Sequence, residues 1–242
     1  MEWHDSPETS DEDLETSFEF FYRTSRRMGI HANILNFLGS SIRNLGSPRS
    51  VSVLDLCCGR GDLASSILNW GKARNIDIQV LAVDRFGRLI QMAKERHGHK
   101  KGITFDIRDF SDSSFHHAQQ FDFVVSSMGL HHLSDTQIVP FIRTVNLLAK
   151  AGFIICDLVR SARALMVMSV LSKMWGEEII RHDAPLSIKR SLTVSDLERY
   201  VKEAGVDATR VQNYFGIYFR LTAERRLAMD PKLSPVPGLL ST

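Results

Sequence analysis

The stretch VLDLCCGRGDLA, residues 53–64, constrains the fold of this chain more strongly than any other part of its sequence. Its apolar beginning is typical of a buried strand, and the carboxylate of Asp55 is followed by two glycines, Gly59 and Gly61. Glycine lets the main chain turn tightly and lets a ligand approach without a Cβ in the way. A helix that begins at about Asp62 would point its amide dipoles at the same spot. We therefore predict a strand, a ligand-binding turn and a helix, in that order.

The turn admits more than one ligand. The segment GRGDLA also satisfies the dinucleotide-binding fingerprint, with Asp84 as its ribose-binding acid. A further hypothesis is a tight strand-to-helix turn that binds nothing. Asp55 favours a third choice, because a carboxylate near the end of an apolar strand is costly to bury without a cationic or hydrogen-bonding partner. We expect a positively charged ligand, since a pyrophosphate would be repelled by that carboxylate.

The rest of the chain alternates short apolar runs with amphipathic segments, which is typical of an α/β protein. The runs are VSVLDL, IQVLAVD, ITFDIRD, FDFVVSS and GFIICDL. Continuous apolar runs of this kind suit a parallel sheet covered on both faces. A helix capped by Thr193 and Asp196 and ended by Gly205 precedes two β-rich runs, ATRVQNYF and IYFRLTAE, which Gly216 joins into a hairpin. We predict a doubly wound, seven-stranded, mostly parallel sheet to which the hairpin adds an antiparallel edge.

One domain accounts for the length of 242 residues. We assign it to residues 18–228, with two N-terminal helices in residues 18–48, broken at Gly29, and a helical lid in residues 161–190. Residues 1–17 lack apolar periodicity, and residues 229–242 are rich in proline. We expect the first of these segments to be disordered and the second to be a flexible tail.

Composition excludes several classes of protein. A net charge of +2 and a hydrophobic fraction of 43% describe an ordinary globular chain, and this charge by itself leaves the partner open. No segment is basic enough to follow a phosphate backbone, so we do not expect nucleic acid as a partner. Cys57 and Cys58 are adjacent and Cys156 is distant, so we expect no disulfide framework and no metal site. The acidic N-terminus resembles no leader, and the most hydrophobic stretch, ALMVMSVL, is far shorter than the roughly 20 residues that cross a bilayer. We expect a cytoplasmic monomer or homodimer without a membrane span.

The motifs together resemble one family. From VLDLCCGRGD through LAVDRF, FDIRDF and FDFVVSSMGLHHLSD to AKAGFIICDL, the chain is similar to the class I S-adenosylmethionine-dependent methyltransferases. The resemblance covers about residues 50–158, and the closing hairpin is similar to that family's reversed last strand. It implies a Rossmann-like fold and S-adenosylmethionine as cofactor, whose ammonium and sulfonium match the positive ligand expected at Asp55. The sequence departs from the fullest glycine pattern of the family at Cys57 and Asp62.

The resemblance assigns roles to individual positions. Asp55 and the glycine turn would frame the methionine part of the cofactor, and Asp84 would accept hydrogen bonds from both ribose hydroxyls. Asp109 would face the adenine amino group. Asp84 and Asp109 also fit the role of helix N-caps after a strand. The full set of cofactor-binding residues implied is Asp55, Cys57, Gly59, Arg60, Gly61, Asp84, Arg85, Asp109, Phe110, Ser127 and Met128, with Phe86 as an alternative to Arg85 beside the adenine.

Histidines are the candidates for a catalytic base, which methyl transfer needs only when the acceptor carries a proton. In GLHHLSD, His131 and His132 follow the fourth strand, and in RHDAPLS, His182 is expected in a loop after the helical lid. For each of them core packing or surface exposure remains open. A second group of candidates accompanies His182, namely Asp157, Arg160, Arg181 and Asp183, together with a methionine-rich helix (Met166, Met168, Met174, Trp175) and Tyr22, Arg23 and Arg27 near the cofactor.

The function implied is methyl transfer to an oxygen or carbon of a small, fairly apolar acceptor of phenolic, quinone-like or polyketide-like chemistry. An RNA or protein methyltransferase is the alternative. The sequence SSMG after the fourth strand lacks the Asn/Asp-Pro-Pro-aromatic motif of enzymes that methylate base amino groups. An NAD-linked oxidoreductase and a cofactor-binding scaffold without catalysis remain as further hypotheses.

Overall fold

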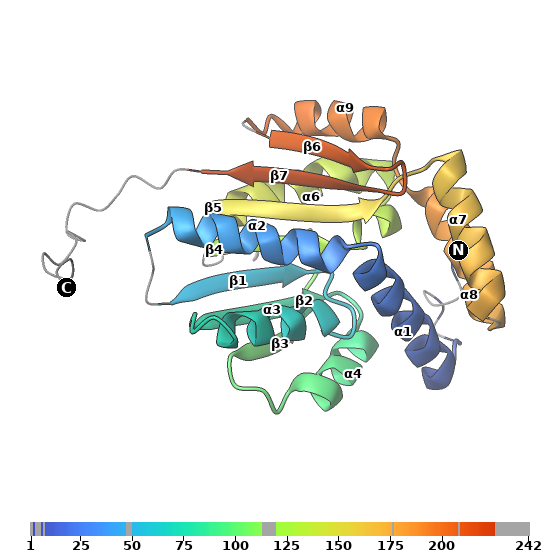
Figure 1. Ribbon diagram of the computed structural model, residues 1–242, viewed down its shortest axis with the longest axis horizontal. Helices are drawn as coiled ribbons and strands as arrows, with labels where there is room; N and C mark the ends of the chain where they lie inside the picture. Colours follow the sequence, from blue (N-terminus) through green and yellow to red (C-terminus); the bar gives the residue numbers. More distant parts are fainter. Residues whose placement is uncertain are drawn as a thin grey trace, which may run out of the picture.

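The computed structural model in Figure 1 describes residues 2, 6, 8–46, 50–112, 120–175, 177–207 and 209–225. Its strands are β1 (Val51–Leu56), β2 (Ile78–Asp84), β3 (Ile103–Ile107), β4 (Phe121–Ser127), β5 (Ala149–Leu158), β6 (Thr209–Tyr214) and β7 (Tyr218–Glu224). Its helices are α1 (Asp11–Arg27), α2 (Ile30–Asn44), α3 (Asp62–Lys72), α4 (Gly87–His97), η2 (Leu130–His132), α6 (Asp135–Leu148), α7 (Ala162–Trp175), α8 (Glu178–Arg190) and α9 (Val194–Ala204).

A seven-stranded sheet of order β3-β2-β1-β4-β5-β7-β6 organises the molecule. Strands β1 to β5 pair in parallel, and β7 runs antiparallel to both β5 and β6. The predicted doubly wound, mostly parallel sheet is therefore confirmed. The hairpin adds an antiparallel pair at the edge of the sheet, as predicted, with β6 at the edge and β7 between β5 and β6. Phe219 and Leu221 of β7 are buried, and β7 is more apolar than β6. A strand of this kind is more stable between two neighbouring strands than at the edge of the sheet.

Helices cover both faces of the sheet. One core cluster packs α2, α3 and α4 against it, and the second packs α6 and α9 against the opposite face. Figure 1 shows α1, α7 and α8 beyond the carboxyl ends of β1, β4 and β5. This third group of helices closes the end of the sheet at which ligands bind in doubly wound folds.

The first helix begins earlier than expected. Residues 11–17, predicted to be disordered, form the first part of α1. The Ser10 side chain accepts a hydrogen bond from the Asp13 amide, and three acidic residues occupy the first turn, where the helix dipole favours them. Leu14 and Ser17 are buried, so this part of α1 packs against the domain. The expected break between the two N-terminal helices lies at Gly29, whose φ is 82°.

The lid also differs from expectation in one place. The segment that holds His182 lies inside α8 rather than in a loop. Pro185 costs about 3 kcal/mol within a helix. The apolar residues Ile179, Ile180, Ala184 and Ile188 recur at helical spacing and are buried in a third core cluster. Their burial outweighs the cost of the proline.

The remaining boundaries agree closely with the sequence. The capping box of α9 joins Thr193 and Asp196, and Gly205 ends that helix with a φ of 68°. No helix in the described part of the chain is both long and apolar enough to cross a membrane. The tail predicted to be flexible, residues 229–242, lies outside the described residues.

Candidate functional site

The turn after β1 is built from residues in the left-handed backbone region. Cys57, Gly59 and Gly61 have φ values of 60°, 53° and 78°. A Cβ on Gly59 would lie 2.9 Å from Cε1 of Phe18, and one on Gly61 would lie 2.5 Å from Cε1 of Phe105. Both glycines are therefore required by space as well as by conformation. Cys57, which replaces a glycine of the family pattern, keeps the left-handed conformation at a cost of about 1–2 kcal/mol.

Asp84 ties the turn to the end of β2. Its Oδ2 accepts a hydrogen bond of 3.0 Å from the Gly59 amide, and its Oδ1 accepts one of 3.0 Å from the Phe86 amide. Burial raises the pKa of Asp84, although the two amides act in the opposite direction. Each carboxylate oxygen can accept two hydrogen bonds, so both can still bind a ligand hydroxyl.

Asp55 lies behind the turn and is 1% exposed. Burial, followed by the charge of Asp84, raises its pKa to about 8, and the Ala64 amide counteracts part of this rise. Its Oδ2 has no hydrogen-bond partner among the described residues. Burial and the neighbouring Asp84 therefore favour the protonated form of Asp55, and a cation bound nearby would favour its ionised form.

A cavity of about 380 Å³ opens beside this turn at the carboxyl ends of β1, β2 and β4. The structure brings eight of the predicted cofactor or catalytic residues to its lining, namely Cys57, Gly59, Asp84, Arg85, Asp109, Phe110, Met128 and His132. Phe86 also lines it and stacks with Arg85, whose guanidinium carbon lies 4.6 Å from the ring centroid. Hydrogen bonds from the amide and hydroxyl of Ser111 fix Asp109 and lower its pKa despite its partial burial.

A smaller cavity of about 110 Å³ lies next to the first. The two share Phe18, Cys57, Gly59, Met128 and His132. The predicted residues Arg60, Ser127 and His131 line the smaller one, and Tyr22 also lines it. Asp55 and Gly61 line neither cavity and act from behind the turn. His31, which the sequence analysis missed, faces this cavity, and burial lowers its pKa to about 4.

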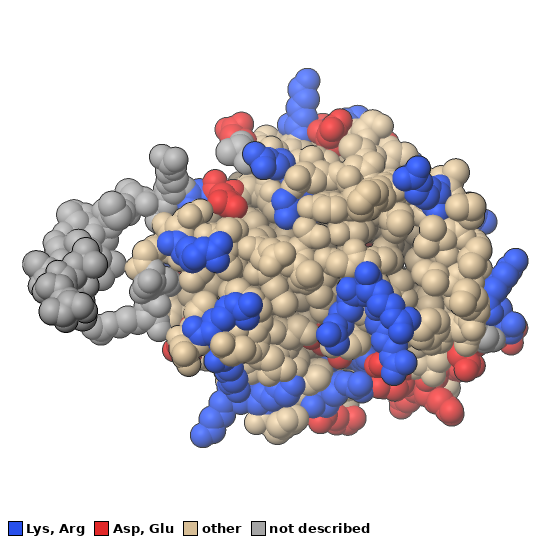
Figure 2. All heavy atoms as spheres, viewed as in Figure 1, with Lys and Arg blue, Asp and Glu red and all other residues tan. Residues whose placement is uncertain are grey.

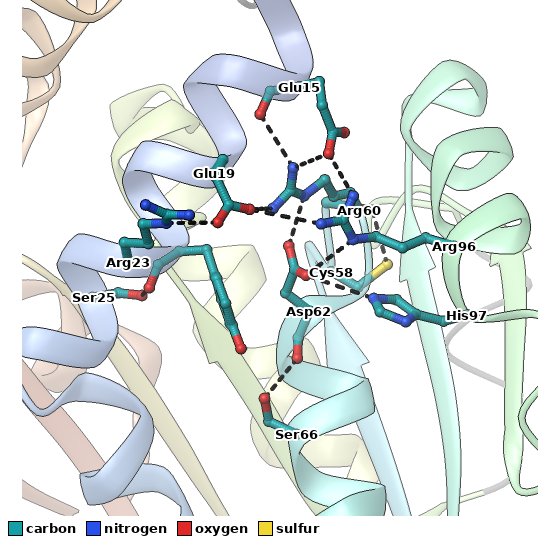
Figure 3. Close-up of polar contacts among 12 residues, drawn as sticks. Glu15, Glu19, Arg23, Ser25, Cys58, Arg60, Asp62, Ser66, Arg96 and His97 are labelled. Atoms are coloured by element: carbon teal, nitrogen blue, oxygen red, sulfur yellow. Dashed lines mark hydrogen bonds and ion pairs between the residues drawn. The ribbon is translucent and has the colours of Figure 1, made fainter. Parts of the chain in front are cut away.

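Arg60 connects the turn to α1 through a network of charges that the sequence analysis did not foresee. Its side chain is fully buried and forms ion pairs of 2.7 Å with Glu15, 2.8 Å with Glu19 and 2.7 Å with Asp62. Figure 3 shows the two glutamates reaching down from α1, with Arg96 and His97 arriving from the other side. On the face seen in Figure 2, acidic side chains gather beside basic ones where α1 lies. The spacing of Glu15 and Glu19, one turn apart on one face of a helix, is the only signal that the sequence offered.

His131 forms a dyad with Asp157, which the sequence analysis had grouped with Arg160 instead. Nδ1 of His131 lies 2.6 Å from Oδ1 of Asp157, and both residues are buried. Oδ2 of Asp157 accepts hydrogen bonds from the amides of Leu130 at 2.6 Å and His131 at 3.2 Å. Burial alone would lower the pKa of His131, but the charge and hydrogen bond of Asp157 outweigh it and raise that pKa. The dyad leaves Nε2 of His131 as the ring nitrogen that can exchange a proton.

Other candidates lie away from the cavities. The His182 side chain is 37% exposed, and its Nδ1 lies 2.7 Å from Oδ1 of the buried Asp183. It lines neither cavity. Among the methionines of α7, Met168 is buried in the core, whereas Met166 and Met174 are exposed to solvent.

Comparisons with known proteins were made on sequence and on structure. A family model described as "Methyltransferase domain" matches residues 53–152, which run from β1 into β5. No curated protein matches the sequence.

Solved structures resemble the chain over most of its length. The plantazolicin methyltransferase BpumL in complex with SAH has a TM-score of 0.68 at 12% identity, covering 90% of this chain and 92% of that one. BamL, crystallised with SAH and a triazolic desmethylPZN analog, has a TM-score of 0.67 at 13% identity and covers 89% and 91%. Magnesium protoporphyrin IX methyltransferase from Synechocystis PCC 6803, with bound SAH, has a TM-score of 0.56 at 14% identity and covers 92% and 91%. At these identities, the similarity establishes the fold.

Proposed function

We propose that this chain, whose residues 53–152 match a methyltransferase-domain family model, transfers the methyl group of S-adenosylmethionine to an oxygen or carbon of a small, fairly apolar acceptor. The observation that carries the proposal is the 380 Å³ cavity, which collects predicted cofactor-binding residues from the ends of β1, β2, β3 and β4. The acceptors that we propose are of phenolic, quinone-like or polyketide-like chemistry.

The adenosyl half of the cofactor fits the larger cavity. Asp84 offers two oxygens to the ribose hydroxyls, and Asp109 offers an acceptor to the adenine amino group. Phe86, which follows β2, and Phe110, which follows β3, supply apolar cover for the adenine. The aromatic and acidic groups therefore meet in the combination that a nucleoside requires.

The charge of the cofactor fits the buried carboxylates. The cofactor supplies an electrophilic methyl group on a sulfonium, and its methionine part carries an ammonium. Burial beside Asp84 raises the pKa of Asp55 to about 8, so Asp55 carries its proton at neutral pH before a cation binds. A cation bound over Gly59 favours the ionised form of Asp55, so cofactor binding and loss of the proton on Asp55 support each other.

His131 is the base for an acceptor that carries a proton. Because Nδ1 donates to Asp157, the neutral ring presents the lone pair of Nε2. The raised pKa of His131 gives this nitrogen the affinity needed to take a proton from a phenol or an activated carbon acid. Asp157 positions the ring and stabilises the imidazolium that forms. His132, whose ring centroid is 4.2 Å from that of His131, separates this base from the larger cavity.

The surroundings of the smaller cavity favour an apolar acceptor. Its lining includes Phe18, Phe21 and Tyr22 from α1 and Met128 after β4. The SAH-bound neighbours include methyltransferases named for plantazolicin and a porphyrin, which supports a small-molecule acceptor over a polymer.

Thermal denaturation with SAH and with NADH tests the proposal. We expect SAH to raise the melting temperature and NADH to leave it unchanged, because only a ligand of the native state stabilises it. Transfer of labelled methyl groups to a panel of phenols, quinols and β-ketoesters then tests catalysis. Stabilisation by NADH alone would overturn the proposal, and methylation of RNA at physiological salt in preference to the panel would favour the alternative.

A further inference from the structure

A buried carboxylate from outside the methyltransferase domain lies beside the proposed base. Glu2 is 0% exposed, and its carboxylate lies within 4.8 Å of ring nitrogens of His131 and His132. Its hydrogen-bond partner on α8, Ser187, is 185 positions away in the sequence. A carboxylate removed from water in this way is costly unless the surrounding groups compensate it.

Two groups that compensate Glu2 come from one face of α8. Ser187 Oγ donates a hydrogen bond of 3.0 Å to Oε2 of Glu2, and Nη1 of Arg190 lies 3.5 Å from Oε1. Ser187 is itself 1% exposed, and its position three residues before Arg190 places both side chains on the same side of the helix. The surroundings of the carboxylate thus include a hydrogen-bond donor, a fixed positive charge and, within 4.8 Å, ring nitrogens of the two histidines.

We propose that Ser187 and Arg190, which lie beside His131 and His132, form a subsite for a carboxylate group of the methyl acceptor, and that Glu2 occupies this subsite in the structure. The inference rests on the proposed function and deepens it, since it selects acidic acceptors from the class named above. The subsite lies at the end of the sheet where His131 and His132 line a cavity, so a carboxylate held there anchors the acceptor beside the base.

A metal ion is the competing occupant, because Glu2, His131 and His132 offer three ligand atoms close together. The charges argue against it. The Arg190 guanidinium lies 3.5 Å from Oε1 of Glu2 and would repel a divalent cation bound there, and Asp157 is already engaged with His131 and two backbone amides. The same arrangement attracts an anion.

Binding of a matched pair of probes tests the subsite. The probes are 4-hydroxybenzoate and 4-hydroxybenzamide, which differ in charge and not in shape. We expect Glu2→Ala to bind 4-hydroxybenzoate about tenfold more tightly than the wild type, because an internal competitor that fills a site most of the time weakens apparent affinity by that order. Binding of the amide is expected to stay within about twofold, and Glu2→Ala/Arg190→Leu is expected to lose the gain.

Controls separate this inference from the function on which it rests. Glu8→Ala, in an exposed position of the same segment, should bind both probes as the wild type does. SAH affinity is measured on every variant, so failure to bind SAH counts against the methyltransferase, whereas normal SAH binding without a gain for 4-hydroxybenzoate overturns the subsite alone. Where Glu2→Ala does not fold, Glu2→Gln keeps the shape of the side chain and is used in its place.

Two further outcomes would overturn the subsite. An equal gain for the amide would mean that removing Glu2 opens space without charge selection. Stabilisation of the wild type by micromolar Zn²⁺, abolished in Glu2→Ala, would identify a metal site instead.

Discussion

Replacing Arg60 by methionine tests how the cofactor turn and α1 are held together. Arg60 is fully buried and pairs with three carboxylates, two of them on α1. Methionine keeps an unbranched chain of similar length and removes the charge. Leu14 and Phe18 of α1 line the larger cavity, so loosening α1 disturbs the cofactor site as well as the fold.

The magnitude follows from the exposure of the partners. Removing one member of a buried ion pair costs about 3–5 kcal/mol, because the other charge is left uncompensated. Glu15 and Glu19 are 42% and 34% exposed and can be rehydrated, whereas Asp62 is 16% exposed. Arg96 also stays within reach of all three. We therefore expect the low end of the range, about 3 kcal/mol.

Urea denaturation, followed by circular dichroism and tryptophan fluorescence, measures this loss. Arg23→Met is the matched control, because Arg23 is 54% exposed and also pairs with Glu19, at 2.7 Å. Its cost should be below about 0.5 kcal/mol. SAH affinity of Arg60→Met should fall by roughly tenfold, since a 1.4 kcal/mol share of the loss corresponds to that factor.

The dependence on pH provides a second check. The hydrogen bond from Arg60 lowers the pKa of Glu19 against the opposing effect of its burial, and hydrogen bonds from His97 and Arg60 outweigh burial to lower that of Asp62. Carboxylates with lowered pKa stabilise the fold fully above their unfolded values near 4 and lose this effect as the pH falls through the folded values. The difference in the free energy of unfolding between wild type and Arg60→Met should therefore narrow below about pH 4. Two results would refute the reasoning. One is a loss of unfolding free energy on Arg60→Met of less than about 1 kcal/mol at pH 7, and the other is a loss that stays the same when Glu19 has already been replaced by glutamine.

Four other changes give separate outcomes. Asp84→Asn should weaken SAH binding by roughly 10–100-fold in calorimetry, as expected for lost charge-assisted hydrogen bonds, and a change within twofold would contradict the ribose assignment. Asp157→Asn should lower kcat and move the acid limb of the pH–rate profile to lower pH, because the pKa of His131 falls when its partner loses charge; an unmoved limb would exclude the dyad. Gly61→Ala should destabilise the fold by about 2–4 kcal/mol in urea titrations, from crowding against its neighbours and a left-handed backbone, whereas a neutral result would contradict the close packing. S-adenosylmethionine binding at pH 7.5 should release a proton, detected in buffers of different ionisation heat, and Asp55→Asn should abolish the release.

The strands and the cofactor turn could be predicted from the sequence because their signals are local. β1, β2 and β4 begin and end where the apolar runs do, since a strand covered on both faces must be apolar throughout. Gly59 and Gly61 stand out because few other residues adopt a positive φ. Asp84 and Asp109 were recognisable from their place after a strand, where parallel strands bring their carboxyl ends to one edge.

The arrangement of charges and the order of the hairpin depended on contacts between distant segments. The partners of Arg60 on α1, Glu15 and Glu19, lie 45 and 41 positions away, and Ser187 lies 185 positions from Glu2. His131 acquires Asp157 as its partner only because β4 and β5 are neighbours in the sheet. Sequence periodicity reports which face of an element is buried, and it carries no information on what that face meets. The amino-acid sequence by itself therefore determined the sheet, the turn and the type of ligand. Only the tertiary structure decided that Asp157 lies behind His131 and how α1 is held, because those interactions join residues that no local pattern connects.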